Sequence, residues 1–314
     1  VLTDGSQGMI SQVNGLAQYL NNNFSSIKTE LRLPWSILQP GILPIYKWIF
    51  KNKINLDEKP EIIISCGRKS VYLSIFLKKI FLNKIITIHI QNPKININKF
   101  DYIIAPNHDK LNGKNVIRSI GALHMFTKEK IEKEETIHNL PNNNLITILI
   151  GGKNRHYEFN KKNIAELIEN LKKLKKKYSK INLLIICSRR TDKFILDILS
   201  SELSGIAFIW NKIDKNPYIY SLKYSDYFVV TSDSTSMISE CAYTGKPIYV
   251  YHLPYKRKSY RIDNFHKDFE NRNITKKFSN NVELKLWYYE KLDEAKRISG
   301  IIKERIIEGI DESR

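Results

Sequence analysis

Short apolar runs alternate with longer amphipathic stretches along the chain. The apolar runs have the length of strands and lie at residues 61–65, 84–91, 101–105, 145–150, 181–187, 206–210, 226–230 and 247–251. Residues 10–20, 71–81 and 160–178 instead place apolar side chains at the spacing of one helix face. Because strands that alternate with helices build parallel sheets, the pattern predicts α/β domains of the doubly wound type. Such sheets bind ligands beyond the carboxyl ends of their strands.

The strand–helix pattern starts twice. The first half opens with a short strand, the glycine-bearing turn Asp4–Gly8 and a helix, and the second half opens in the same way around Gly151–Arg155. Between them, His138–Asn144 is polar and has no periodicity, which is typical of a linker. We therefore expect one Rossmann-like domain over residues 1–140 and a second over residues 141–314, with a terminal helix at about 286–310.

The stretch from Thr231 to Pro247 has the clearest chemistry. Asp233 or Ser234 can cap a helix that Gly245 and Pro247 end. The free N–H groups and positive dipole end of such a helix attract anions, phosphate above all. Hydroxyl groups surround this helix start, on Ser232, Ser234, Thr235 and Ser236.

Glu240 lies further along the same helix, roughly 9 Å along its axis from the start. A carboxylate at that distance from a bound diphosphate can accept the two hydroxyls of a ribose. The alternative is an ordinary amphipathic helix whose Glu240 is only solvated. Two further features lie at carboxyl ends of strands: Gly151 and Gly152 allow close backbone approach, and Arg189 and Arg190 suit a diphosphate. We expect one arginine to bind phosphate, the other being surface.

Charge and cysteine content change this picture little. The formal net charge is +19, which favours anionic partners. Many lysines, however, lie on a predicted solvated helix face, as in Lys172–Lys177, and no nucleic-acid-binding signature accompanies them. We expect no nucleic-acid partner. The three cysteines have no metal-binding spacing, which predicts neither zinc nor disulfides and fits a reducing cytoplasm.

Leu31–Phe50 is the most apolar irregular segment. Three prolines exclude one long helix, so we expect a loop and then a short helix, with Trp35 and Trp48 as amphipathic side chains. Packing against the sheet is the expected role. Docking on a membrane interface or a lipid acceptor is the alternative.

Several motifs resemble one known family. Asn216-Pro-Tyr218, Val229–Glu240 and Thr244–Tyr249, together with Thr3-Asp-Gly5, are similar to the elongated-mitochondria (mitochondrial-fission) family. Its bacterial members are described as candidate glycosyltransferases. The Ser239-Glu240 helix that ends in Gly-x-Pro also resembles the donor-site helix of GT-B glycosyltransferases. The resemblance implies the GT-B fold: two Rossmann-like domains facing across a cleft, with the terminal helix crossing back to the first.

The same resemblance implies a function. We expect metal-independent transfer of a sugar from a nucleotide-diphosphate sugar to a lipid-linked or glycan acceptor, in cell-envelope glycan or glycolipid synthesis such as that of lipopolysaccharide. The nucleotide sugar is a substrate, so no cofactor and no metal are expected. The donor residues would be Gly151, Gly152, Arg189, Arg190, Ser232, Ser234, Thr235, Ser236 and Glu240.

The first domain would hold the acceptor and a general base. Asp109 or His108 is the first choice of catalytic base, and Asp4 the second. Relatives often carry a histidine at Met9 and carboxylates at Asn92 and Asn107, so those groups are missing here. The acceptor-side residues would be Gly5, Gly8, Gln12, Arg68, Gln91 and His124.

Two other classes of function stay open at this stage. A sugar-nucleotide epimerase uses the same fold, and a non-catalytic, membrane-associated protein of the fission type would need no reaction at all. In each case we expect a cytoplasmic location, with peripheral attachment to the anionic inner face of the plasma membrane as a further expectation.

Overall fold

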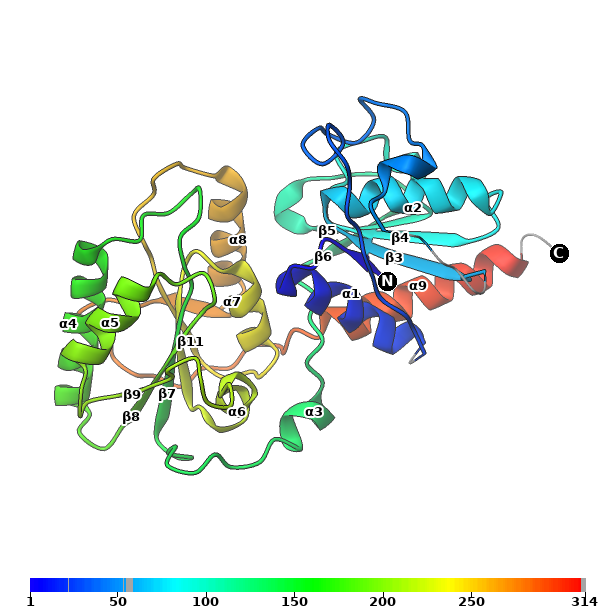
Figure 1. The fold of residues 1–314 in the computed structure, drawn as a ribbon. Coiled ribbons are helices and arrows are strands. Elements are labelled where there is room, and N and C mark those ends of the chain that lie inside the picture. Colours follow the sequence, from blue (N-terminus) through cyan, green and yellow to red (C-terminus); the bar gives the residue numbers. More distant parts are fainter. Residues whose placement is uncertain (22, 53, 55–58, 312–314) are drawn as a thin grey trace. The chain divides into compact units, whose positions relative to one another are not determined.

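The computed structural model describes residues 1–21, 23–52, 54 and 59–311. Contacts divide the chain into two compact units, residues 1–125 with 293–314, and residues 126–292. Each unit is built on a six-stranded sheet whose paired strands are parallel (Figure 1). The predicted α/β class with two Rossmann-like domains is confirmed. That these face each other across a cleft stays a prediction.

The first unit has the strand order β2-β1-β3-β4-β5-β6. The chain goes from β1 outward to β2, returns to pair β3 with β1, and then continues in the other direction, so the topology switches between β1 and β3. The strands are β1 (Leu2–Thr3), β2 (Ile27–Lys28), β3 (Ile62–Cys66), β4 (Ile86–Ile90), β5 (Tyr102–Pro106) and β6 (Val116–Ser119), and the helical elements are α1 (Gln7–Leu20), η1 (Lys47–Ile49), α2 (Arg68–Ile80), η2 (Ile97–Lys99), η3 (Asn107–Asp109) and α9 (Glu294–Asp311).

Helices cover both faces of this sheet. Figure 1 shows α1 and α9 on one face and α2 on the other. The first face buries Leu16 of α1 and Ile298 and Ile302 of α9, none of which is exposed to solvent. Glu294 anchors the start of α9, because its carboxylate accepts the backbone N–H of Ile120 at 2.6 Å. The last helix of the chain is thus a core element of the first unit.

The second unit has the strand order β12-β11-β10-β7-β8-β9. Its topology switches between β7 and β10, because the chain leaves β7 toward β8 and leaves β10 toward β11. The strands are β7 (Leu145–Ile150), β8 (Asn182–Cys187), β9 (Phe208–Ile209), β10 (Tyr227–Thr231), β11 (Ile248–Tyr251) and β12 (Thr275–Lys277), and the helices are α3 (Lys128–Glu132), α4 (Lys161–Lys177), α5 (Lys193–Glu202), α6 (Tyr218–Tyr224), α7 (Thr235–Ala242) and α8 (Tyr260–Asn271).

The core of this unit follows the apolar pattern of the sequence. All six residues of β7 are buried, as expected for a central parallel strand with helices on both faces. Figure 1 shows α4 and α5 on one face and α7 and α8 on the other. The predicted stripe of α4 is buried against the sheet, while most lysines of that helix face solvent.

The division between the units lies at Met125 and Phe126 rather than at residues 140 and 141. The stretch that we expected to be a linker packs on α6 of the second unit: Tyr220 donates its hydroxyl to the carbonyl of Leu140 at 3.1 Å. Nearby, Lys223 donates to the carbonyl of Glu132 at 2.8 Å. Short polar segments of this kind have no apolar periodicity even when they are well packed, which explains the misplacement.

The terminal helix begins later than residue 286. Residues 284–293 have no regular secondary structure and bury Trp287, whose ring lies 5.2 Å from that of Tyr249 in the second unit. No helix in the described part of the chain is long and apolar enough to cross a lipid bilayer.

Replacing Ile298 by Ala tests the place of α9 in the first unit. The side chain is fully buried, so we expect the unit to lose about 2–5 kcal/mol of stability. The matched control is Ile307→Ala on the same helix, where the side chain is 60% exposed; its effect should stay within about 0.5 kcal/mol. Hydrogen exchange of the β3–β5 amides reports this unit alone, and equal effects of the two substitutions would contradict the packing described.

Candidate functional site

The strongest candidate site lies where the topology of the second sheet switches. The loop after β7, which begins at Gly151, and the loop after β10, which begins at Ser232, leave neighbouring parallel strands at the same edge. In doubly wound sheets this is where ligands bind. Helix α7 begins directly after the second loop, so its N-terminus lies at the same place.

A buried carboxylate joins the two loops. Asp233 accepts the N–H of Gly152 at 2.9 Å and the hydroxyl of Thr231 at 2.6 Å, and Thr231 in turn accepts the N–H of Gly151 at 2.8 Å. Arg190 from the loop after β8 adds an ion pair to Asp233 at 3.1 Å. Burial raises the pKa of the Asp233 carboxyl, and these hydrogen bonds and the Arg190 charge oppose that rise.

The two glycines are needed by this network. A Cβ atom at position 151 would lie 2.1 Å from a carboxylate oxygen of Asp233, and one at position 152 would lie 2.2 Å from the carbonyl oxygen of Arg190. The close approach predicted for Gly151 and Gly152 is therefore made by the protein itself. Their contact with a ligand stays a prediction.

The hydroxyl residues at the start of α7 have different environments. Ser234 caps the helix, because its hydroxyl accepts the N–H of Met237 at 3.4 Å. Ser232 is fully buried, and its hydroxyl accepts the N–H of Leu253 at 3.0 Å. Thr235 and Ser236 are half-buried in the first helical turn, where N–H groups have no partner within the helix. The anion site predicted here would thus consist mainly of the first turn.

Glu240 has an unusual environment. It is half-buried near the end of α7, and its carboxylate accepts the hydroxyl of Tyr218 from α6. Burial raises the pKa of Glu240 to about 7, although the hydrogen bond from Tyr218 favours the ionised form. Tyr218 is held in turn by the ring of Phe126 at 5.7 Å. Tyr218 belongs to the Asn216-Pro-Tyr218 motif, but sequence reasoning gave it no role.

The two arginines after β8 differ. Arg190 is tied to the Asp233 network and also donates to the carbonyl of Gly152 at 3.4 Å. Arg189 is exposed and makes no ion pair with any residue that the structure describes. Arg189 is therefore the arginine available to an incoming anion, and Arg190 is the one that orders the loops.

A second chain of polar contacts was not predicted from the sequence. The Nε2 atom of His266 on α8 lies 2.9 Å from the carbonyl oxygen of Ser232 and 3.4 Å from the hydroxyl of Tyr157. Tyr157 donates to Tyr255 at 3.2 Å, and the two rings stack at 4.8 Å. Tyr255 donates to Asp263. These contacts hold the residues around Tyr255 against α8, and no spacing in the sequence indicates them.

The predicted acceptor-side residues of the first unit gather partly at its own switch point. Asp4 accepts the N–H of Ser6 at 3.0 Å, Gly5 has a φ of +89°, and Gln12 donates to the carbonyl of Gly8 at 3.1 Å. The turn after β3 adjoins the first turn of α1, because a Cβ atom on Gly67 would lie 2.3 Å from the sulfur of Met9.

Arg68 follows Gly67 but has a structural task. Its guanidinium donates to the carbonyls of Trp35, Ser36 and Leu38, which holds the segment before η1. Contact of Arg68 with an acceptor stays a prediction.

The remaining predicted residues follow other strands of the first sheet. Gln91 directly follows β4 and has a φ of +84°. His108 and Asp109 lie in η3 after β5, with Nε2 and Oδ1 3.9 Å apart. His124 is buried at 2% exposure. All follow the carboxyl ends of strands, and the catalytic role of Asp4, His108 and Asp109 and the acceptor role of Gln91 and His124 stay predictions. Among the described residues, no three His, Cys, Asp or Glu side chains form a group that could hold a metal ion.

The fold and this site define a class: an α/β protein of two Rossmann-like units with a polar site at a strand switch point. A family model described as "Mitochondrial fission ELM1" matches residues 7–306. The chain belongs to this family, which confirms the resemblance stated from its motifs.

Two relatives span most of the chain. An uncharacterized protein, RP120, of Rickettsia prowazekii (strain Madrid E) is 29% identical over 349 residues, covering 96% of this chain and 97% of that protein. The mitochondrial fission protein ELM1 of Arabidopsis thaliana is 24% identical over 310 residues, covering 85% of this chain and 70% of that protein.

Solved structures are similar at a lower level. The UDP-GlcNAc 2-epimerase of Methanocaldococcus jannaschii has 13% identity and a TM-score of 0.48, with 79% of this chain and 78% of that chain covered. The S. aureus MnaA–UDP co-structure has 12% identity and a TM-score of 0.48, with 97% of this chain and 95% of that chain covered.

Replacing Glu240 by Gln should change how stability depends on pH. A carboxyl whose folded pKa is about 7, against about 4.3 when unfolded, destabilises the fold increasingly as pH rises through that interval. Between pH 5 and pH 8 the melting temperature of Glu240→Gln should therefore rise relative to that of the wild type. The rise should correspond to about 1–3 kcal/mol in the free energy of unfolding. Glu169→Gln, on the exposed face of α4, is the control. A gain that does not vary with pH would refute the assignment.

Proposed function

We propose that the chain is a glycosyltransferase that takes a sugar from a nucleotide-diphosphate sugar without a metal ion or cofactor. The observation that carries the proposal is Glu240: a half-buried carboxylate, bonded to Tyr218, on a helix that starts at the strand switch point. A carboxyl with so raised a pKa in a site-bearing helix is more typical of a functional group than of a solvated one.

The donor would lie along α7. Its diphosphate would meet the first-turn N–H groups of Thr235 and Ser236, the positive end of the helix and the guanidinium of Arg189. Glu240 lies five residues beyond Thr235, about 8 Å along the axis, where its carboxylate would accept the ribose hydroxyls. The Asp233 network would keep both loops in place without touching the donor.

In the reaction, an acceptor oxygen would attack the anomeric carbon as the bond from that carbon to the diphosphate oxygen breaks. The helix dipole and Arg189 would stabilise the charge that develops on the leaving diphosphate. The acceptor's proton would pass to a base of the first unit, Asp109 or His108 first and Asp4 second. The acceptor itself would be lipid-linked or a glycan of the cell envelope, with the protein in the cytoplasm and attached peripherally to the membrane.

Calorimetric titration with UDP and other nucleoside diphosphates tests the donor site. At pH 8, Glu240→Gln should weaken nucleotide binding by about 1–3 kcal/mol, the range for a lost hydrogen bond to a charged group. Glu169→Gln should bind as the wild type does. Equal affinities of Glu240→Gln and wild type would remove Glu240 from the site.

Proton release gives an independent reading of the same contact. Ribose hydroxyls donate to the ionised carboxylate, so binding should lower the pKa of Glu240 and release part of a proton near pH 7. Titrations in buffers of different ionisation enthalpy measure that release. It should be absent at pH 8.5 and should disappear in Glu240→Gln, and release that persists in this variant would belong to another group.

The same preparations separate the other classes of function. Incubating UDP-GlcNAc without an acceptor and analysing the sugar would reveal an epimerase. No binding of any nucleoside diphosphate or nucleotide sugar would favour a non-catalytic protein of the fission type.

A further inference from the structure

The most unusual surface of the first unit is formed by residues 33–48, which we term the apolar loop. Five large apolar or aromatic side chains on it are exposed, two of them more than two-thirds. These are Leu33 at 68%, Ile37 at 71%, Ile42 at 61%, Tyr46 at 49% and Trp48 at 58%. Soluble surfaces rarely gather so many apolar groups in one short segment unless the patch binds something.

Hydrogen bonds from buried or half-buried side chains hold the apolar loop on the first unit. Trp35 is buried at 7% exposure and donates its Nε1–H to the carbonyl of Pro44 at 3.0 Å. Tyr72 of α2 donates to the carbonyl of Leu38 at 3.1 Å, which is also one of the three carbonyls that Arg68 holds. The rings of Trp35 and Trp48 pack nearly perpendicular to each other, with their centroids 4.9 Å apart. Trp35 is thus a support rather than one of the two anchoring side chains of the docking alternative, and Trp48 is presented outward.

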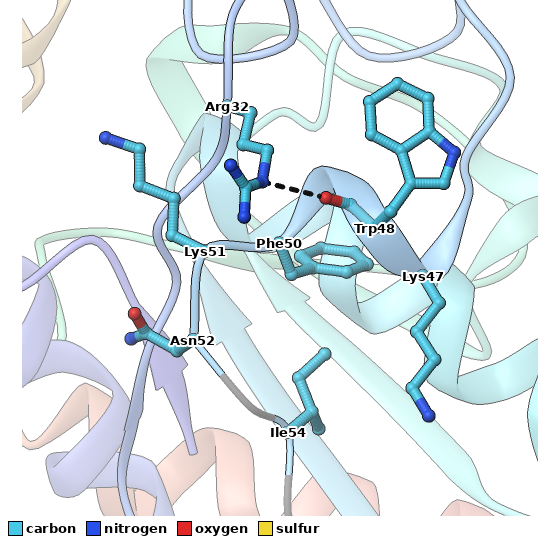
Figure 2. A pocket seen from close by; sticks show the side chains of 7 residues that line it. All are labelled: Arg32, Lys47, Trp48, Phe50, Lys51, Asn52 and Ile54. Atoms are coloured by element: carbon cyan, nitrogen blue, oxygen red, sulfur yellow. Dashed lines mark hydrogen bonds between the residues drawn. The ribbon is translucent and has the colours of Figure 1, made fainter.

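The charges around the apolar loop are distributed in an ordered way. Residues 33–46 contain no charged side chain, whereas Arg32 precedes them and Lys47 and Lys51 follow. Figure 2 shows Lys47 and Lys51 extending on opposite sides of Phe50, with Arg32 bonded to the carbonyl of Trp48 at 3.1 Å. These basic side chains line a cavity of about 560 Å³ with Trp48 and Phe50. The acidic residue nearest in sequence, Glu30, is paired with Lys28 at 2.5 Å.

We propose that the apolar loop docks on an anionic lipid bilayer, with the exposed apolar side chains in the headgroup region and Arg32, Lys47 and Lys51 against lipid phosphates. The uncharged segment suits the apolar side of the interface, and the basic residues beside it suit the layer of anionic headgroups. Apolar insertion alone or charge attraction alone gives only marginal binding. Because the loop is already ordered, little conformational entropy is lost on insertion. This inference names the surface for the membrane attachment in the proposed function, and it needs no nucleotide-sugar chemistry.

Vesicle flotation of the full chain tests the docking. Phosphatidylcholine vesicles should bind weakly, and vesicles that also contain phosphatidylglycerol should bind well at low salt and less at high salt. Lys47→Gln with Lys51→Gln should weaken binding to the anionic vesicles roughly 10- to 30-fold, at about fivefold for each basic residue. Ile37→Ser with Trp48→Ser should weaken it by about tenfold or more.

The matched control is Leu286→Ser with Tyr288→Ser, which removes side chains of 73% and 90% exposure from the second unit. This control should float like the wild type. Equal binding to both kinds of vesicle, no binding to either, or an equal loss in the control would each overturn the proposal. Melting curves check that every variant is folded. Calorimetry with nucleoside diphosphates on the same variants keeps failure of docking distinct from failure of the donor site.

Discussion

The second unit depends on one buried carboxylate. Asp233 sits between two loops that leave neighbouring strands, and it satisfies backbone and side-chain donors from both while pairing with Arg190. A buried charge of this kind is tolerated only with several partners, and removing any of them leaves it uncompensated. Neighbouring residues are constrained in turn: glycine at 151 leaves room for the carboxylate, glycine at 152 leaves room for the backbone of its ion-pair partner Arg190, and Thr231 at the strand end donates its hydroxyl to it.

Much of the fold could be predicted because it rests on apolar periodicity. β7 is uninterrupted in sequence and completely buried in the structure, and the apolar stripe of α4 faces the sheet as its spacing indicates. The division of the chain could not be placed in the same way. Phe126 to Leu140 is held to the second unit by hydrogen bonds to carbonyl groups, and such contacts depend on backbone geometry rather than on residue type.

Those residues of the candidate site whose places depend on local sequence properties could be predicted. Ser234 at the start of α7 follows from its preference for capping a helix, and the place of Glu240 further along α7 follows from helical spacing. Tyr218 and His266 are different. Each reaches its partner from a helix distant in sequence, Tyr218 at Glu240 and His266 at Ser232. Likewise, the sequence predicts Asp233 as a possible helix cap. That Asp233 links two loops could not be predicted without knowing that β7 and β10 are neighbouring strands.

Because α9 completes the first unit, the order of synthesis has a consequence for folding. The second unit is one continuous segment and is complete as soon as Leu292 has left the ribosome. The first unit must wait for Ile298 and Ile302, although it contains the start of the chain. Until then the face of its sheet that α9 covers stays unshielded, and such surfaces are the ones that aggregate or recruit chaperones. A nascent chain would therefore finish its second unit before its first.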